Sequence, residues 1–148
     1  MIDAIHAQDA SSYFEMFELG EAAIVDMGIS PDVLRECQGV LRRFGADDFN
    51  LLLRALTEAK FANTPEPGEE TIQYCTQLTG YRNDARILAA AEECLADVLL
   101  THDKKHFIGN PLISPPDTNC RAMTAEEYLD WCLTALLVTD ELSEQEDA

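Results

Sequence analysis

The sequence predicts an α/β fold in which a short parallel sheet is flanked by helices. Three apolar segments have the length and composition of strands, at about residues 22–29, 97–101 and 119–123, and segments with helical periodicity lie between them. Because strands and helices alternate along the chain, we expect these strands to lie parallel in one sheet and to be joined by right-handed crossovers. With 148 residues, the chain is long enough to form one domain with a sizeable core.

The stretch from residue 83 to residue 107 predicts the central helix and strand of this fold. Asn83 is the expected N-cap, and Asp84 falls in the first turn, where a carboxylate suits the helix dipole. The apolar residues that recur at helical spacing are Ile87, Leu88, Ala91, Cys94 and Leu95. The run from Val98 to Leu100 is typical of a short strand that is covered on both faces.

The lengths of this helix and this strand bring two carboxylates together. A helix of about twelve residues is roughly 18 Å long, and a strand of about five residues returns roughly 17 Å. Asp84 at the helix start and Asp103 after the strand should therefore lie at the same edge of the sheet. Open α/β folds place ligands at the carboxyl ends of parallel strands, and paired carboxylates there suggest a divalent-cation site.

The same residues resemble the C-terminal half of a PIN domain. The pattern is D-A-x-I-L-A-A-A from Asp84, followed by A-D-x-L-L-T-x-D-K-x-x-F from Ala96 to Phe107. The similarity extends more weakly over residues 1–138. PIN domains are small α/β metal-dependent ribonucleases, many of them toxins of toxin–antitoxin pairs. The resemblance implies a PIN-like three-layer sandwich over residues 1–140. The acidic composition of residues 141–148 predicts a disordered tail.

The resemblance also implies a set of site residues. Glu36, Asp84, Asp103 and Asp3 would hold Mg²⁺ or Mn²⁺, and the ion would activate water for hydrolysis of an RNA phosphodiester. Glu36 matches the family acid in a helix that Ser30 and Pro31 begin at the same sheet edge. The nearest phosphate contacts would be Lys104 and Arg82.

The N-terminus can be matched to the first metal-binding aspartate of the PIN pattern in two ways. Either Asp3 is that aspartate in a degenerate context, or the segment from Met1 to Ile5 matches the residues just after it. In the second case the chain lacks this ligand and most of the first strand. The alternative function is then a catalytically inactive PIN-like module that works by binding protein.

The net charge of −18, from 28 acidic and 10 basic residues, disfavours simple RNA binding. Nucleic acid is bound chiefly through neutralisation of its phosphates, which an acidic surface repels. Three explanations stay open: a solvated acidic surface and tail, a host with high internal salt, or a basic partner that covers the surface. The expected partners are therefore RNA, an antitoxin or another basic protein, and a second copy of the chain in a homodimer.

Short sequence patterns predict the structure of the remaining segments. Helices are expected at about 9–20 and 69–79, which Gly20 and Gly80 would close, at 30–43 and 47–61, and from Thr124, whose T-A-E-E is a capping box. For residues 69–79 a strand stays open as the alternative, and a loop is expected at 63–68. The five cysteines include no C-x-x-C pair, so we interpret them as reduced core residues of a cytoplasmic protein. No run of eighteen apolar residues or signal-peptide pattern occurs, so no membrane association is expected.

Overall fold

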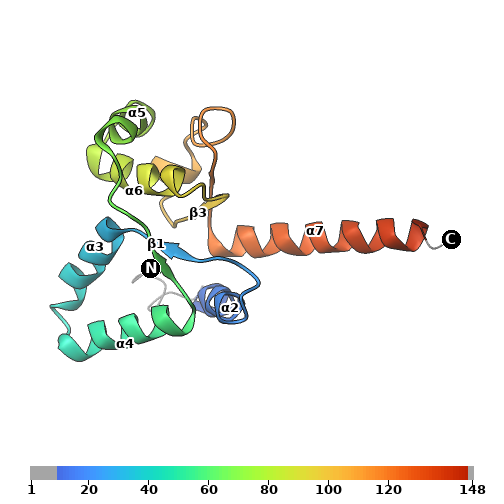
Figure 1. Cartoon of the computed structure of the whole chain (residues 1–148), viewed down its shortest axis with the longest axis horizontal. Coiled ribbons are helices and arrows are strands. Elements are labelled where there is room, and N and C mark those ends of the chain that lie inside the picture. The colour runs from blue at the N-terminus through green and yellow to red at the C-terminus, as the bar shows by residue number, and fades with distance from the viewer. Residues whose placement is uncertain (1–9, 147–148) are drawn as a thin grey trace.

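The computed structural model describes residues 10–146 and has a mixed α/β fold, as the sequence predicts (Figure 1). Its helices are α2 (Ala10–Glu21), α3 (Pro31–Leu41), α4 (Ala46–Glu58), α5 (Glu69–Thr79), α6 (Arg82–Glu93) and α7 (Ala125–Glu146). Its strands are β1 (Gly28–Ile29), β2 (Ala62–Asn63), β3 (Val98–Leu100) and β4 (Arg121–Met123), and a π-helical turn, η1, spans Lys104–Ile108. The expected first strand near residue 1 lies outside the described residues.

The strands form two separate sheets, which corrects the prediction of a single one. β3 pairs in parallel with β4, with Val98 opposite Arg121, as expected for these two strands. β1 instead pairs in parallel with β2, with Gly28 opposite Ala62. The segment Ala62–Asn63 was expected to belong to helix and loop, so β2 is a strand that the sequence did not predict.

The predicted strand at 22–29 comprises only Gly28 and Ile29 in the structure. Residues at the start of the predicted strand instead form the turn that ends α2. Ala23 has a left-handed backbone (φ 56°), and the Ile24 amide donates to the Leu19 carbonyl at 3.0 Å. This is a Schellman ending, which turns the chain sharply away from the helix axis. Gly20, expected to close α2, lies one residue before its end, where an added Cβ would come within 2.6 Å of the Ala59 carbonyl oxygen.

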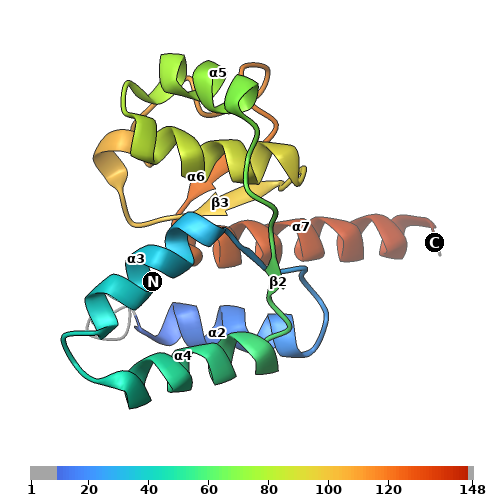
Figure 2. The same ribbon diagram turned by 60° about the vertical axis from the view of Figure 1, so that its left-hand side comes forward.

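Two hydrophobic clusters form the core, and the helices that build them, α3 and α4 for one and α5 and α6 for the other, lie in different parts of the molecule (Figure 2). The first cluster joins α3, α4 and β1 through Ile29, Cys37, Leu41, Leu52 and Leu56. The second cluster joins α5, α6 and the segments around β4 through Ile72, Cys75, Ala85, Leu88, Ala89, Phe107, Ile113 and Cys120. Of the predicted apolar face of α6, Leu88 is buried and Ile87 and Ala91 are half-buried, whereas the helix ends at Glu93 and leaves Cys94 and Leu95 exposed.

The last helix begins as predicted and runs farther than expected. The Thr124 amide donates to Glu127 Oε2 at 3.0 Å and the Glu127 amide donates to Thr124 Oγ1 at 3.1 Å, which completes the capping box. α7 then continues to Glu146, so residues 141–146 are helical where we expected a disordered tail. Only the first part of α7 packs on the body, against α2, and the rest projects away from it (Figures 1 and 2). Within residues 10–146, no helix is both long and apolar enough to cross a membrane.

Candidate functional site

The start of α6 and the end of β3 lie at the same edge of the fold, as the helix and strand lengths predict. The ring of Tyr81, the N-cap residue of α6, meets the ring of His106 edge-on, with centroids 5.2 Å apart. Tyr81 lies three residues before Asp84, and His106 lies three residues after Asp103. Asp84 is in the first turn of α6 as expected, whereas Asn83 is a helical residue and not the N-cap.

Asp103 uses its carboxylate to hold its own turn together. Asp103 Oδ1 accepts hydrogen bonds from the amides of Lys105 at 3.1 Å and His106 at 2.9 Å, and Oδ2 lies 2.8 Å from His106 Nδ1. Burial alone would raise the pKa of Asp103, but the hydrogen bonds from His106 and Lys105 outweigh burial and hold the pKa below its usual value. Both oxygens are thus engaged locally, and the carboxylate fixes the orientation of the His106 ring.

Glu36 is an exposed residue of α3, next to the buried Cys37. The acid of α3 that contacts α6 is Asp32, one turn earlier, whose Oδ1 lies 3.0 Å from Arg86 Nε. Sequence spacing could not distinguish Asp32 from Glu36, because the two lie on the same side of the helix.

The expected group of metal-binding carboxylates is not found in the described chain. Within residues 10–146, no three His, Cys, Asp or Glu side chains lie close enough to hold one metal ion, so Glu36, Asp84 and Asp103 do not form such a group. Asp3, the fourth expected ligand, lies outside these residues. Binding of Mg²⁺ or Mn²⁺ stays a prediction of the resemblance.

The two expected phosphate contacts differ in their surroundings. Arg82 is held by Glu69 in a two-point ion pair, with Nη1–Oε1 and Nη2–Oε2 distances of 2.9 Å each. Lys104 is exposed in the first position of η1. An RNA phosphate at this edge would therefore compete with Glu69 for Arg82, whereas Lys104 is accessible.

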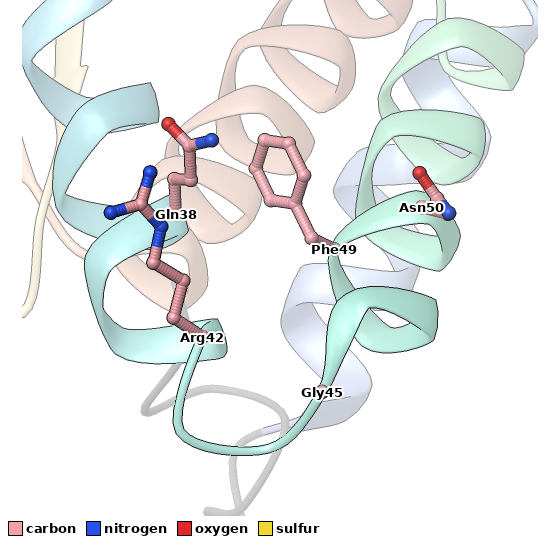
Figure 3. Close-up of a pocket in the computed structure, with 5 residues that line it drawn as sticks. All are labelled: Gln38, Arg42, Gly45, Phe49 and Asn50. Carbon is pink, nitrogen blue, oxygen red and sulfur yellow. The ribbon is translucent and has the colours of Figure 1, made fainter.

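A shallow hollow lies elsewhere, between the end of α3 and the start of α4 (Figure 3). It has a volume of about 370 Å³ and is lined by Gln38, Arg42, Gly45, Phe49 and Asn50. In Figure 3 the Phe49 ring faces α3, and Gly45 lies in the connecting loop with a φ of 119°, which favours glycine. None of the site residues expected from the sequence lines this hollow.

The most unusual surface of the described chain is the projecting part of α7. Six large apolar side chains of this helix are about half exposed or more: Trp131, Leu133, Leu136, Leu137, Val138 and Leu142. The capping box at Thr124 predicts this helix but not the exposure of its apolar side chains. Its signal in the sequence is the nine-residue run from Trp131 to Thr139, which contains no charged residue.

The three regions described above differ in the chemistry of their side chains. The edge near Asp84 and Asp103 holds a carboxylate–imidazole pair, the hollow at Phe49 holds one arginine and two amides, and α7 presents apolar surface. No protein-family model, no curated protein and no solved structure matches this chain.

Proposed function

We propose that this chain is a PIN-like protein-interaction module and that its contact element is α7. The carrying observation is the exposure of apolar side chains along this helix, with Leu136 63% and Leu137 65% exposed. Large exposed apolar patches on soluble domains mark interaction sites, because water is displaced from them when a partner binds. The order of α6, β3 and the parallel strand β4 supports the PIN-like part of the proposal, since the resemblance implies that order.

The distribution of these side chains around α7 supports a binding role. At 3.6 residues per turn, Trp131, Val138 and Leu142 lie along one side of the helix. Leu133, Leu136 and Leu137 lie roughly on the opposite side. A helix that is apolar on more than one side is normally buried by neighbouring protein. Full burial of one leucine stabilises a complex by about 1.5–3 kcal/mol, so even partial covering of this surface favours association.

Site-specific crosslinking tests the proposal. A photoreactive amino acid replaces Leu136 in the full chain, in the organism that makes it, and a control replaces Leu51 of α4, which is 60% exposed against 63% for Leu136. We expect position 136, and not position 51, to crosslink to a defined protein that mass spectrometry identifies. That protein, once purified, should bind the unmodified chain. Equal labelling from both positions, or none from position 136, would contradict the proposal.

The second candidate function is metal-dependent hydrolysis of RNA, as in the PIN ribonucleases and the toxins among them. The contact between Tyr81 and His106 favours it, because it brings the segments of Asp84 and Asp103 to one edge. In this function Glu36, Asp84, Asp103 and Asp3 hold the ion, which supplies an activated water, while Lys104 and Arg82 contact phosphate.

A pair of measurements on the full chain tests this second function. Mn²⁺ should raise the melting temperature, since a ligand of the folded state alone stabilises it, and the chain should cleave RNA with the metal present. Asp84→Asn keeps the shape and removes the charge, so it should abolish both effects. A folded protein that shows neither metal stabilisation nor cleavage would rule out the nuclease function for this chain.

A further inference from the structure

The charges of α7 are arranged in two groups that flank its apolar centre. The first group lies before Trp131 and the second begins after Thr139. In chain order the acidic residues of the helix are Glu126, Glu127, Asp130, Asp140, Glu141, Glu144 and Glu146. The sequence from Ala122 to Ala148 contains no lysine, arginine or histidine. The helix is thus apolar in the middle and negatively charged at both ends.

Glu126, Glu127, Asp130 and Glu141, the acids of α7 whose side chains are described, take part in none of the ion pairs found among the described side chains. The bases of those ion pairs are Arg35, Arg82, Arg86 and His106. The whole chain carries a net charge of −18, so it has few basic residues with which to neutralise α7. A group that neutralises these acids is therefore expected on another molecule.

A second copy of the chain fits this helix poorly. If two α7 helices pair in parallel, each acidic group lies beside the same group of the other copy. If they pair antiparallel about the apolar centre, the first acidic group of one copy lies beside the second acidic group of the other. Both arrangements bring like charges together, and like charges opposed across an interface discourage association. Charge therefore selects against a homodimer through α7.

We propose that α7 is covered by an amphipathic helical segment of another protein, apolar in its centre and rich in lysine and arginine at both ends. This inference rests on the proposed interaction function and specifies the chemistry of the partner. Trp131, Val138 and Leu142 are spaced by seven and four residues, which is the spacing of a helix–helix seam. Asp130 and Glu141 are eleven residues apart, so the two basic groups of the partner should be roughly 17 Å apart along its axis.

Peptide binding to the full chain tests this partner chemistry. Three helical peptides without tryptophan share one leucine seam and differ only in their ends, which carry lysine and arginine, glutamine, or glutamate. Trp131 is the single tryptophan of the chain, so its fluorescence reports directly on the covering of α7. We expect the basic-ended peptide to shift the Trp131 emission to shorter wavelength and to reduce acrylamide quenching. The glutamate-ended peptide should bind at least about tenfold more weakly, a difference that shrinks in 1 M salt, where screening is nearly complete.

A matched pair of double variants locates the binding surface. Val138→Gln with Leu142→Gln removes apolar surface from the seam, and both residues are exposed, so the fold should persist. Leu51→Gln with Leu53→Gln makes a similar change at two exposed positions of α4. The seam variant should bind the basic-ended peptide at least about tenfold more weakly, as expected when two buried leucine-sized contacts are lost, while the α4 variant binds as the unmodified chain does.

The possible outcomes separate this inference from the interaction function. Equal binding of the basic-ended and glutamate-ended peptides would overturn the partner chemistry and leave α7 as a binding surface. A concentration-dependent blue shift of Trp131 without peptide would show a second copy on α7 and would also overturn it. If no peptide changes the Trp131 emission while crosslinking from position 136 succeeds, the proposed partner chemistry is wrong and the interaction function stands. If crosslinking from position 136 fails as well, both the partner chemistry and the interaction function are wrong.

Discussion

Arg86 and Asp32 join the two halves of the molecule. Arg86 Nε of α6 lies 3.0 Å from Asp32 Oδ1 of α3, and Arg86 Nη2 lies 2.8 Å from Glu66 Oε2 in the loop before α5. Arg35 completes the group, with contacts of 2.9 Å to Asp32 and 2.7 Å to Glu66. Because α3 contributes to the first hydrophobic cluster and α6 to the second, this polar group links the two clusters.

Arg86→Met should destabilise the fold by about 1–2 kcal/mol. The Arg86 and Asp32 side chains are only 25% and 17% exposed, so the variant leaves a largely buried carboxylate with Arg35 alone. Urea unfolding followed by circular dichroism measures the change. The control is Arg82→Met, which breaks an ion pair whose two side chains are more than half exposed, and it should have little effect. Equal effects of the two variants would show that Arg86 has no special role.

The contribution of the Arg86–Asp32 pair should depend on pH. Burial tends to raise the pKa of Asp32, but the hydrogen bonds and charges of Arg86 and Arg35 outweigh it, so the pKa lies below its usual value. A carboxyl whose pKa is lowered by folding stabilises the protein above its unfolded pKa, about 3.9, and loses this contribution as the pH falls through the folded pKa. The difference in free energy of unfolding between the unmodified chain and Arg86→Met should therefore be largest at pH 7 and should become smaller below about pH 4. A difference that stays constant from pH 7 to pH 3 would contradict the account.

The five thiols should differ widely in reactivity. Cys37, Cys75 and Cys120 are buried, and burial raises the pKa of all three, that of Cys75 to about 11. Since the thiolate is the reactive form, iodoacetamide at pH 8 should label exposed Cys94 first and these three only when the chain unfolds. Peptide mass spectrometry over time measures the order. Labelling of Cys120 as fast as Cys94 in the folded protein would show that the second hydrophobic cluster is open.

Leu95→Gly should stabilise the fold by about 0.5–1 kcal/mol. Leu95 ends α6 with a left-handed backbone (φ 57°), which costs a leucine energy and costs glycine little. Its side chain is 74% exposed, so little apolar contact is lost when it is removed. Thermal unfolding measures the gain, and Leu95→Ala is the control because it removes the side chain and keeps the strained backbone. If the glycine and alanine variants have the same stability, the backbone is not strained at this position.

Elements set by short-range contacts were predictable from the sequence. Ser30 accepts a hydrogen bond from the Val33 amide at 3.3 Å, and Gly80 has the left-handed backbone (φ 78°) expected after α5. The parallel pair of β3 and β4 was also predicted, because two strand segments separated by one long connection can pair in parallel. The two helix ends depend on residue type and spacing within a few turns of chain.

The second sheet and the arrangement of the site were not predictable in the same way. β2 consists of Ala62 and Asn63, two residues with no strand signal, and it forms because their backbone meets β1 from a distant part of the chain. Asp103 carries the family pattern in the sequence, yet its oxygens bind the next turn, a choice that depends on local geometry. Whether Asp32 or Glu36 faces α6 depends on the exact position of α3 against Arg86, which spacing alone does not determine.

The accessibility of Trp131 in a complex with the crosslinked partner tests the central claim most directly. Trp131 is 51% exposed in the chain alone and is its single tryptophan. Acrylamide quenching is measured on the full chain, first alone and then with the purified protein identified from position 136. If a basic helical segment of that protein covers α7, the quenching constant should fall severalfold and recover when the partner's lysines and arginines are replaced by glutamate. An unchanged quenching constant in the complex would contradict the assignment of the Trp131 side of α7 as the surface that the basic helical segment covers.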